Sequence, residues 1–233
     1  YYSDNAQMDF VFVLDLSNSM AKVGNAEAGD NNPRLYDMKS KLLDVTNKLM
    51  TTPGYDCRVA FTGFGEKSWM SSDRFFDSAS EAANFIWEDL GTYYENTNYG
   101  LGLSAAETLV TGNTGRNTTV VFISDGQPYA GKDKPIPQPY YGYDEAEAIK
   151  AAGAEIYAVL QSVPAEELGN AQRIMETICT DGRFFTADQT SEFSRAVNQA
   201  IACGFTTYTL VDVVGADFEL NRSSVRVSAG EVD

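Results

Sequence analysis

The sequence contains no histidine and few basic residues. Its 233 residues include 17 Lys and Arg against 33 Asp and Glu, which gives a formal net charge of −16. Without histidine the chain has neither a Ser-His-Asp nor a Cys-His catalytic group, and no His-ligated zinc site. A surface this acidic repels phosphate backbones and anionic lipid headgroups, so we expect neither a nucleic-acid partner nor a membrane-surface role.

Long apolar runs are also missing. No stretch reaches the roughly 18 consecutive apolar residues of a membrane-spanning helix, so we expect no direct membrane insertion. The chain opens at Tyr1 without a segment that resembles a signal peptide, and we interpret it as an internal part of a longer protein. Three cysteines are too few for a disulfide scaffold and lack the CxxC spacing of zinc sites.

Short apolar runs alternate with helical periodicities along the chain. Unbroken runs rich in Val, Ile and Phe are typical of strands buried on both faces, and they lie at residues 10–14, 59–64, 119–123, 156–160 and 184–185. Apolar residues spaced three and four apart predict helices over 35–49, 101–109, 146–150, 171–178 and 193–201.

This alternation predicts an α/β fold with a doubly wound, mostly parallel sheet that is covered by helices on both faces. We expect Arg74 to Asp77 to form one antiparallel edge strand. The pattern changes after Cys203, where the sequence is β-rich and has no helical period. We therefore expect a domain over residues 1–204 and the start of a β-rich stalk module over 205–233. The alternative is that this short all-β segment adds edge strands to the first domain.

Oxygen-bearing side chains follow two of the predicted strands. Asp15, Ser17 and Ser19 come directly after the first strand, and Asp125 follows the strand that ends at Ile123. Thr97 precedes a predicted helix, where it either caps that helix or faces the same crevice. Ligands of such sheets bind outside the carboxyl ends of the strands. Two carboxylates and three hydroxyls are an all-oxygen set suited to Mg²⁺, although Ser and Asp also gather in turns for local hydrogen bonding.

The charge of this set indicates what the site does. Two aspartates balance a divalent cation, and hydroxyls and water leave the cation electrophilic, with one position open to an outside acidic oxygen. We therefore expect the site to bind a carboxylate of a partner rather than to perform hydrolysis, and the protein not to be an enzyme.

These motifs resemble the von Willebrand factor type A domain, of the kind found in surface proteins and pilus-tip adhesins of Gram-positive bacteria. That family carries D-x-S-x-S, T-N-x-G and I-[ST]-D-G patterns, which stand here at Asp15–Ser19, Thr97–Gly100 and Ile123–Gly126. The resemblance implies a metal-ion-dependent adhesion site that binds Mg²⁺ or Mn²⁺, with Ca²⁺ as an alternative. It also implies that Ser17 and Ser19 are direct ligands, with Asp15, Thr97 and Asp125 binding directly or through water.

Two tyrosine-containing loops are expected to rim the cation. One precedes Thr97 and the other spans residues 126–143; the candidate contact residues are Tyr93, Tyr94, Tyr129, Tyr140 and Tyr141. Tyrosine is a rigid contact residue with a polar tip. The alternative is a plain connector whose tyrosines pack inward.

The ends of the last two predicted helices carry Cys179 and Cys203. Both residues are expected on the face opposite the metal, where they are a candidate disulfide, with Cys57 as the competing partner.

The resulting hypothesis is a metal-dependent adhesion module at the cell surface, attached to the cell wall or to a pilus. Its expected partners are an acidic residue of a host or extracellular-matrix protein and further domains of its own chain. Two alternatives stay open: a docking domain of a metal-insertion or protein-assembly machine, and a structural pilus subunit whose site is vestigial.

Overall fold

The computed structural model describes residues 6–22, 33–53, 55–70, 75–90, 95–113, 115–161, 163, 165–187, 195, 198 and 199. The predicted helix over 193–201 lies largely outside these residues, and the β-rich segment 205–233 lies outside them entirely. Both stay predictions.

The described residues form one sheet in the order β3-β2-β1-β4-β5-β6. Its strands are β1 (Ala6–Asp15), β2 (Tyr55–Phe64), β3 (Ser68–Met70), β4 (Asn117–Ser124), β5 (Glu155–Gln161) and β6 (Phe184–Ala187). All neighbouring pairs are parallel except β2 with β3, which is antiparallel. The predicted fold class, a mostly parallel sheet with one antiparallel edge strand, is confirmed.

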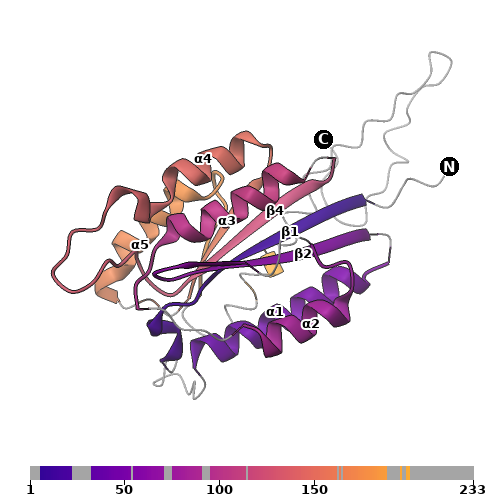
Figure 1. Cartoon of the computed structure of the whole chain (residues 1–233), viewed down its shortest axis with the longest axis horizontal. Coiled ribbons are helices and arrows are strands. Elements are labelled where there is room, and N and C mark those ends of the chain that lie inside the picture. Colours follow the sequence, from indigo (N-terminus) through magenta and orange to yellow (C-terminus); the bar gives the residue numbers. More distant parts are fainter. Residues whose placement is uncertain are drawn as a thin grey trace, which may run out of the picture.

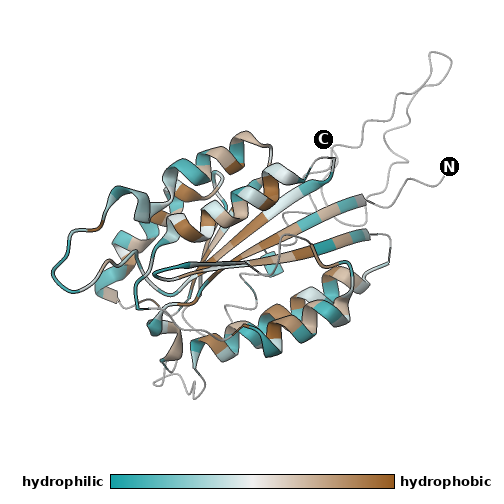
Figure 2. Ribbon diagram, viewed as in Figure 1, coloured by the Kyte–Doolittle hydropathy of each residue, from teal (hydrophilic) through white to brown (hydrophobic). Residues whose placement is uncertain are grey.

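Helices cover both faces of this sheet (Figure 1). The first face carries α1 (Arg34–Thr51) and α2 (Ala79–Glu88), and the second carries α3 (Tyr99–Gly112), α4 (Tyr143–Ala151) and α5 (Ala165–Ile178). Figure 2 shows apolar residues along the strands and on the helix sides that face them. Successive side chains of a strand point to opposite faces, so an unbroken apolar run supplies two cores.

β1 shows this division. Phe10, Phe12 and Leu14 pack on the side of α1 and α2, whereas Val11 and Val13 pack on the side of α3 and α5. All five side chains are fully buried. β1 is therefore the central strand around which both layers assemble.

The edge strand lies earlier than the sequence indicated. Antiparallel pairing to β2 is made by Ser68–Met70, not by Arg74–Asp77. Within the predicted segment, Phe76 alone makes an isolated antiparallel bridge, to Val59, and Arg74 is outside the described residues. The chain reverses direction after β2 and runs back along it. Ser68–Met70 therefore pairs with the end of β2, at Thr62–Phe64, before Phe76 reaches Val59 further back.

Helix α2 was not predicted, although the sequence carries a signal for it. The Ser78 hydroxyl accepts a hydrogen bond from the Glu81 backbone N–H, and Ala82 and Ile86 are buried one turn apart. Ser followed three residues later by Glu is a recognised start of a helix.

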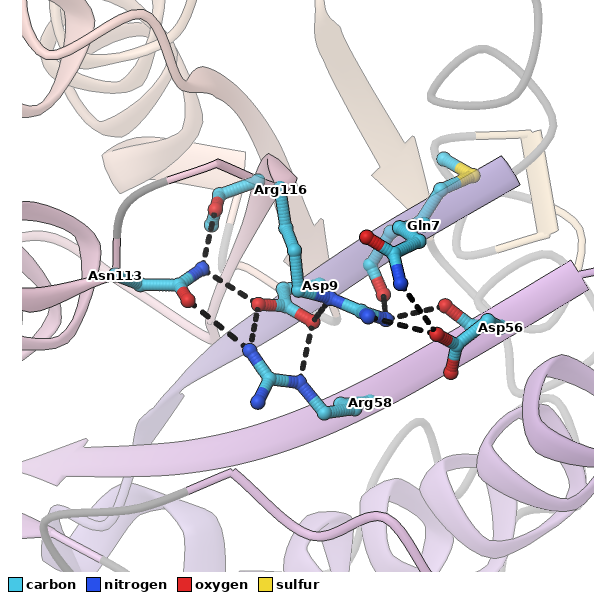
Figure 3. Close-up of polar contacts among 8 residues, drawn as sticks. Gln7, Asp9, Asp56, Arg58, Asn113 and Arg116 are labelled. Carbon is cyan, nitrogen blue, oxygen red and sulfur yellow. Dashed lines mark hydrogen bonds and ion pairs between the residues drawn. The ribbon is translucent and has the colours of Figure 1, made fainter. Parts of the chain in front are cut away.

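A buried ion-pair cluster lies toward the amino ends of the central strands (Figure 3). Asp9 of β1 is fully buried and pairs with Arg58 of β2 and with Arg116, which directly precedes β4. Asn113 donates a further hydrogen bond to Asp9, and Arg116 also pairs with Asp56. The cluster joins β1, β2 and the segment before β4.

Among the described residues, no helix is both long and apolar enough to cross a bilayer.

Candidate metal centre

The predicted ligands converge between β1 and β4, where the order of the strands in the sheet reverses. β1 and β4 are adjacent and parallel, yet β1 continues to α1 on one face and β4 to α4 on the other. The chain segments that leave their carboxyl ends therefore diverge and open a crevice between them, which is where ligands of open α/β sheets bind. Asp15 ends β1, and Asp125 follows β4 directly.

Local hydrogen bonds fix the carboxylate of Asp15. Its Oδ1 accepts from the Ser17 backbone N–H at 2.9 Å, which turns the chain sharply after β1. Its Oδ2 accepts from the Ser124 hydroxyl at 2.6 Å, across the β1–β4 pair. The turn continues into the short 3-10 helix η1 (Asn18–Ala21), which is anchored by the buried side chain of Met20.

Three further oxygens form a chain beside Asp15. The hydroxyls of Ser17 and Ser19 are 2.8 Å apart, and the Ser19 hydroxyl donates to Asp125 Oδ1 at 2.7 Å. Ser19 and Asp125 are 106 residues apart in the sequence. The fold therefore unites the D-x-S-x-S segment with the aspartate after β4, as the sequence indicated.

Thr97 lines the same crevice. The N-cap of α3 is Asn98, whose side chain accepts from the Leu101 N–H, so Thr97 is not needed to cap its own helix. Backbone hydrogen bonds in both directions between Thr97 and Tyr129 fix the position of Thr97. Of the two roles left open by the sequence, the structure places Thr97 at the crevice.

Tyr99 contacts the turn that carries Asp125, and the sequence did not indicate this role. It is fully buried, and its hydroxyl donates to the Gly126 carbonyl at 2.5 Å and lies 3.2 Å from the Ser124 hydroxyl. The ring contacts Phe64 and Phe122 in edge-on geometry. Tyr99 thus connects α3 to the turn that carries Asp125.

The crevice is a cavity of about 390 Å³. Its wall includes Ser17, Ser19, Thr97 and Asp125 together with charged residues that the motif did not indicate: Lys22, Arg34, Glu95 and Glu167. Of these four, Arg34 makes an ion pair with Asp125, with its Nη1 2.5 Å from Oδ2. No periodicity or motif in the sequence indicates Arg34 at this site.

The two aspartates repel each other electrostatically. Burial, with a further contribution from the nearby charge of Asp125, raises the pKa of Asp15 to about 7, while the hydrogen bonds from Ser124 and Ser17 act in the opposite direction. Arg34 compensates the charge of Asp125 in part, whereas no ion pair to Asp15 occurs among the described residues, so the two neighbouring carboxylates are not fully neutralised. A divalent cation would supply the remaining positive charge.

The donors fit a small, hard cation. Oxygen separations of 2.7 to 2.8 Å are those of hydrogen bonds, and they also match the roughly 2.9 Å between adjacent ligands around octahedral Mg²⁺. Only two carboxylates take part, and the described residues hold no group of three or more Asp, Glu, Cys or His side chains arranged to bind a metal. The set therefore suits an ion that keeps hydroxyl and water ligands.

Comparison with known proteins identifies the fold. No protein-family model matches the sequence, and no curated protein shows significant similarity to it. Among solved structures, the PilB minor pilin from Streptococcus sanguinis matches with a TM-score of 0.71 at 14% identity, over 88% of this chain and 63% of that chain. The vWF domain of the type V pili tip protein Mfa5 from Porphyromonas gingivalis matches with a TM-score of 0.66 at 15% identity, over 91% and 100%. The chain has the fold of a von Willebrand factor type A domain.

A third structure with this fold contains a metal. Proximal thread matrix protein 1 from the mussel byssus, described with a zinc-occupied MIDAS motif, matches with a TM-score of 0.63 at 20% identity, over 85% of this chain and 46% of that chain. This chain thus spans less than two thirds of PilB and less than half of the byssus protein. At these identities the likeness concerns the von Willebrand A fold alone.

Of the five rim tyrosines, Tyr129 lines the cavity and is 45% exposed. Tyr93 and Tyr94 lie outside the described residues. Tyr140 and Tyr141 belong to the short 3-10 helix η3 (Gln138–Tyr141) and are not among the residues that line the cavity; Tyr141 stacks on Tyr143 and packs against the core beside α3. For Tyr141 the inward-packing alternative describes this structure.

Gly100 at the start of α3 allows the segment that contains η3 to pack closely against this helix. A Cβ on Gly100 would lie 2.0 Å from the Pro139 carbonyl oxygen, so only glycine permits the approach. Gly102 is packed as closely, because a Cβ there would lie 2.5 Å from the Phe64 ring and 2.9 Å from the Val13 side chain.

The two cysteines within the described residues are not among those that line the candidate metal centre. Cys57 and Cys179 are buried and form no disulfide within the described part of the chain, and burial raises the pKa of both thiols, to about 11 for Cys57. Cys203 lies outside the described residues, so its pairing with Cys179 stays a prediction.

Proposed function

We propose that this chain is a metal-dependent adhesion module of a pilus or another cell-surface protein. Asp15, Ser17, Ser19, Thr97 and Asp125 would hold Mg²⁺ or Mn²⁺, with Ca²⁺ as an alternative. The observation that carries the proposal is the union of Ser17, Ser19 and Asp125 through contacts of 2.7 to 2.8 Å on the wall of one cavity.

When bound, the cation supplies an electrophilic centre for a carboxylate oxygen of a partner. The chain's own contribution is preorganisation: both oxygens of Asp15 and Oδ1 of Asp125 already accept hydrogen bonds. These bonds hold the donors in place, so little ordering is required when the site fills. A cavity of about 390 Å³ admits a side chain with water rather than a folded domain. The partner must therefore present its acidic residue on a protruding segment.

A binding role is proposed instead of a catalytic one. The chain has no histidine to act as a general base, and the carboxylates of Asp15 and Asp125 are both engaged by hydroxyls. The proposed partner is an acidic residue of a host or extracellular-matrix protein.

A pilus or cell-surface location is supported by what the similar structures are called, a minor pilin and a pilus-tip domain. Residues 205–233 would then begin a stalk module that connects the chain to further domains. The likeness is one of fold, so location and connection are part of the proposal.

Titration calorimetry with Mn²⁺ and Mg²⁺ tests the metal site. We expect binding by the wild type, and loss of binding in Asp125→Ala and Ser19→Ala. Ser104→Ala is the matched control, because Ser104 is an exposed serine on α3. Unchanged affinity in both site variants would refute the proposal.

Adhesion is tested on immobilised extracellular-matrix proteins. We expect attachment that is removed by EDTA and restored by Mg²⁺ for the wild type, and none for Asp125→Ala. Attachment that survives EDTA would contradict metal-dependent adhesion.

One observation favours a second candidate, a structural pilus subunit whose site is closed. Arg34 already pairs with Asp125 at 2.5 Å, which places a positive charge where a cation would bind. If the pair is permanent, the wild type binds no metal at millimolar concentration.

A further inference from the structure

Arg34 occupies an unusual position for a basic residue. It is the first residue of α1, and cations are disfavoured at this end of a helix because the helix dipole is positive there. Its backbone N–H donates to the Lys22 carbonyl, which fixes the start of α1 beside the end of the D-x-S-x-S turn. Local helix energetics therefore do not explain the arginine, whereas its contact in the cavity does.

The guanidinium of Arg34 replaces part of the missing positive charge. Nη1 lies 2.5 Å from Asp125 Oδ2, with the two side chains only 13% and 1% exposed. The other oxygen of Asp125 accepts from Ser19 at 2.7 Å. Both oxygens of Asp125 are thus engaged, and a cation that binds Oδ2 directly must remove the arginine first.

This ion pair is incompletely satisfied. Arg34 Nε is buried, and no hydrogen-bond partner for it occurs in the described part of the chain. Arginine pairs most strongly with a carboxylate through two parallel hydrogen bonds, but Arg34 contacts Asp125 through Nη1. A buried donor without a partner raises the free energy of the closed arrangement. The unpartnered Nε therefore makes this pair easier to displace than an ion pair that is satisfied through two hydrogen bonds.

We propose that Arg34 is an internal competitor of the metal: its guanidinium binds Asp125 in the metal-free protein and must leave when a divalent cation binds. This inference rests on the metal site of the proposed function. It assigns Arg34 the role of setting the affinity of that site, so that the site fills only at metal concentrations high enough to displace the arginine.

Calorimetry on three proteins tests the competition. Arg34→Gln removes the competing charge, whereas Lys22→Gln removes an equal charge from an exposed cavity residue that makes no contact to Asp125 among the described residues. We expect Arg34→Gln to bind Mn²⁺ about tenfold to a hundredfold more tightly than the wild type, the range of one charge-assisted hydrogen bond. Lys22→Gln should change the affinity by less than about fivefold, because exposed charges are screened. Equal effects of the two substitutions, or weaker binding by Arg34→Gln, would overturn the inference.

A crystal structure of the Mg²⁺-loaded wild type gives an independent test that needs no variant. We expect the Arg34 guanidinium to have left Asp125 Oδ2. A loaded site with the 2.5 Å pair intact would refute the competition while leaving the metal site in place.

The outcomes separate the two proposals. If only Arg34→Gln binds metal, the competition holds and the wild type is the closed structural subunit described above. If neither protein binds metal, both proposals fail.

Discussion

Replacing Asp9 by Asn should destabilise the fold severely without affecting the metal centre. Four donors point at this buried carboxylate, two on each oxygen. Oδ1 accepts from Arg58 Nε at 2.9 Å and from Arg116 Nε at 2.8 Å, and Oδ2 accepts from Arg58 Nη2 at 2.6 Å and from Asn113 Nδ2 at 2.5 Å. In either amide orientation, the NH₂ group of an asparagine would face two donors. Arg58 would also lose its counter-charge, and Arg116 would keep only its pair with Asp56.

The magnitude follows from this geometry. Removing one partner of a buried ion pair costs about 3–5 kcal/mol. We expect the lower end, about 3 kcal/mol, because Arg58 is 30% exposed and partly solvated once it is unpaired. Asp56→Asn is the matched control: Asp56 pairs with the same Arg116 but is 44% exposed, so its loss should cost less than about 1 kcal/mol.

Urea denaturation followed by circular dichroism measures both variants. The midpoint of Asp9→Asn should fall with an unchanged m-value, while Mn²⁺ affinity stays at the wild-type level because the cluster lies at the other end of β1. A loss below about 1 kcal/mol for Asp9→Asn, or a loss equal to that of Asp56→Asn, would refute the reasoning.

Three further predictions concern other parts of the chain. In EDTA, Asp15→Asn should become more stable relative to the wild type as the pH rises from 5 to 8. The raised pKa of Asp15 means that the folded state binds the proton more tightly than the unfolded state, so stability is lost as the pH rises through about 7; an equal difference at both pH values in urea melts would contradict this. Gly100→Ala should lower the melting temperature because its Cβ meets the Pro139 carbonyl, whereas Gly169→Ala in α5 should raise it slightly, since no described atom lies within 4 Å; equal effects would refute the packing argument. The Cys57 thiol, with a pKa of about 11, should resist iodoacetamide at pH 8 until urea is added, and mass spectrometry showing rapid alkylation of the native protein would disprove its burial.

The layers of the fold were predictable because unbroken apolar runs and helical periods are local properties. Phe10 to Leu14 and Val120 to Ile123 are fully buried strand residues, as their composition indicated. Ser68–Met70 was not predictable as the edge strand, because three residues are too short to show an alternation. The Ser78–Glu81 start of α2 is a local signal too, and it favours a helix that begins at that position.

The candidate metal centre was partly predictable. The three motifs lie at strand ends and at a helix start, and parallel topology brings strand ends to one edge of the sheet. Arg34 could not be predicted, because it enters the cavity from a helix that begins 15 residues after Ser19, and no spacing rule specifies where a long side chain points. The ion pairs of Asp9 could not be predicted for a similar reason. A single aspartate at the edge of an apolar run does not indicate the two arginines that neutralise it.

Crystals of the chain soaked in MnCl₂ give the most direct test of the central claim. An anomalous difference map at the manganese edge should show one peak in the cavity, at bonding distance from the hydroxyl oxygens of Ser17 and Ser19. An empty cavity, or a peak elsewhere in the molecule only, would contradict the proposed adhesion site.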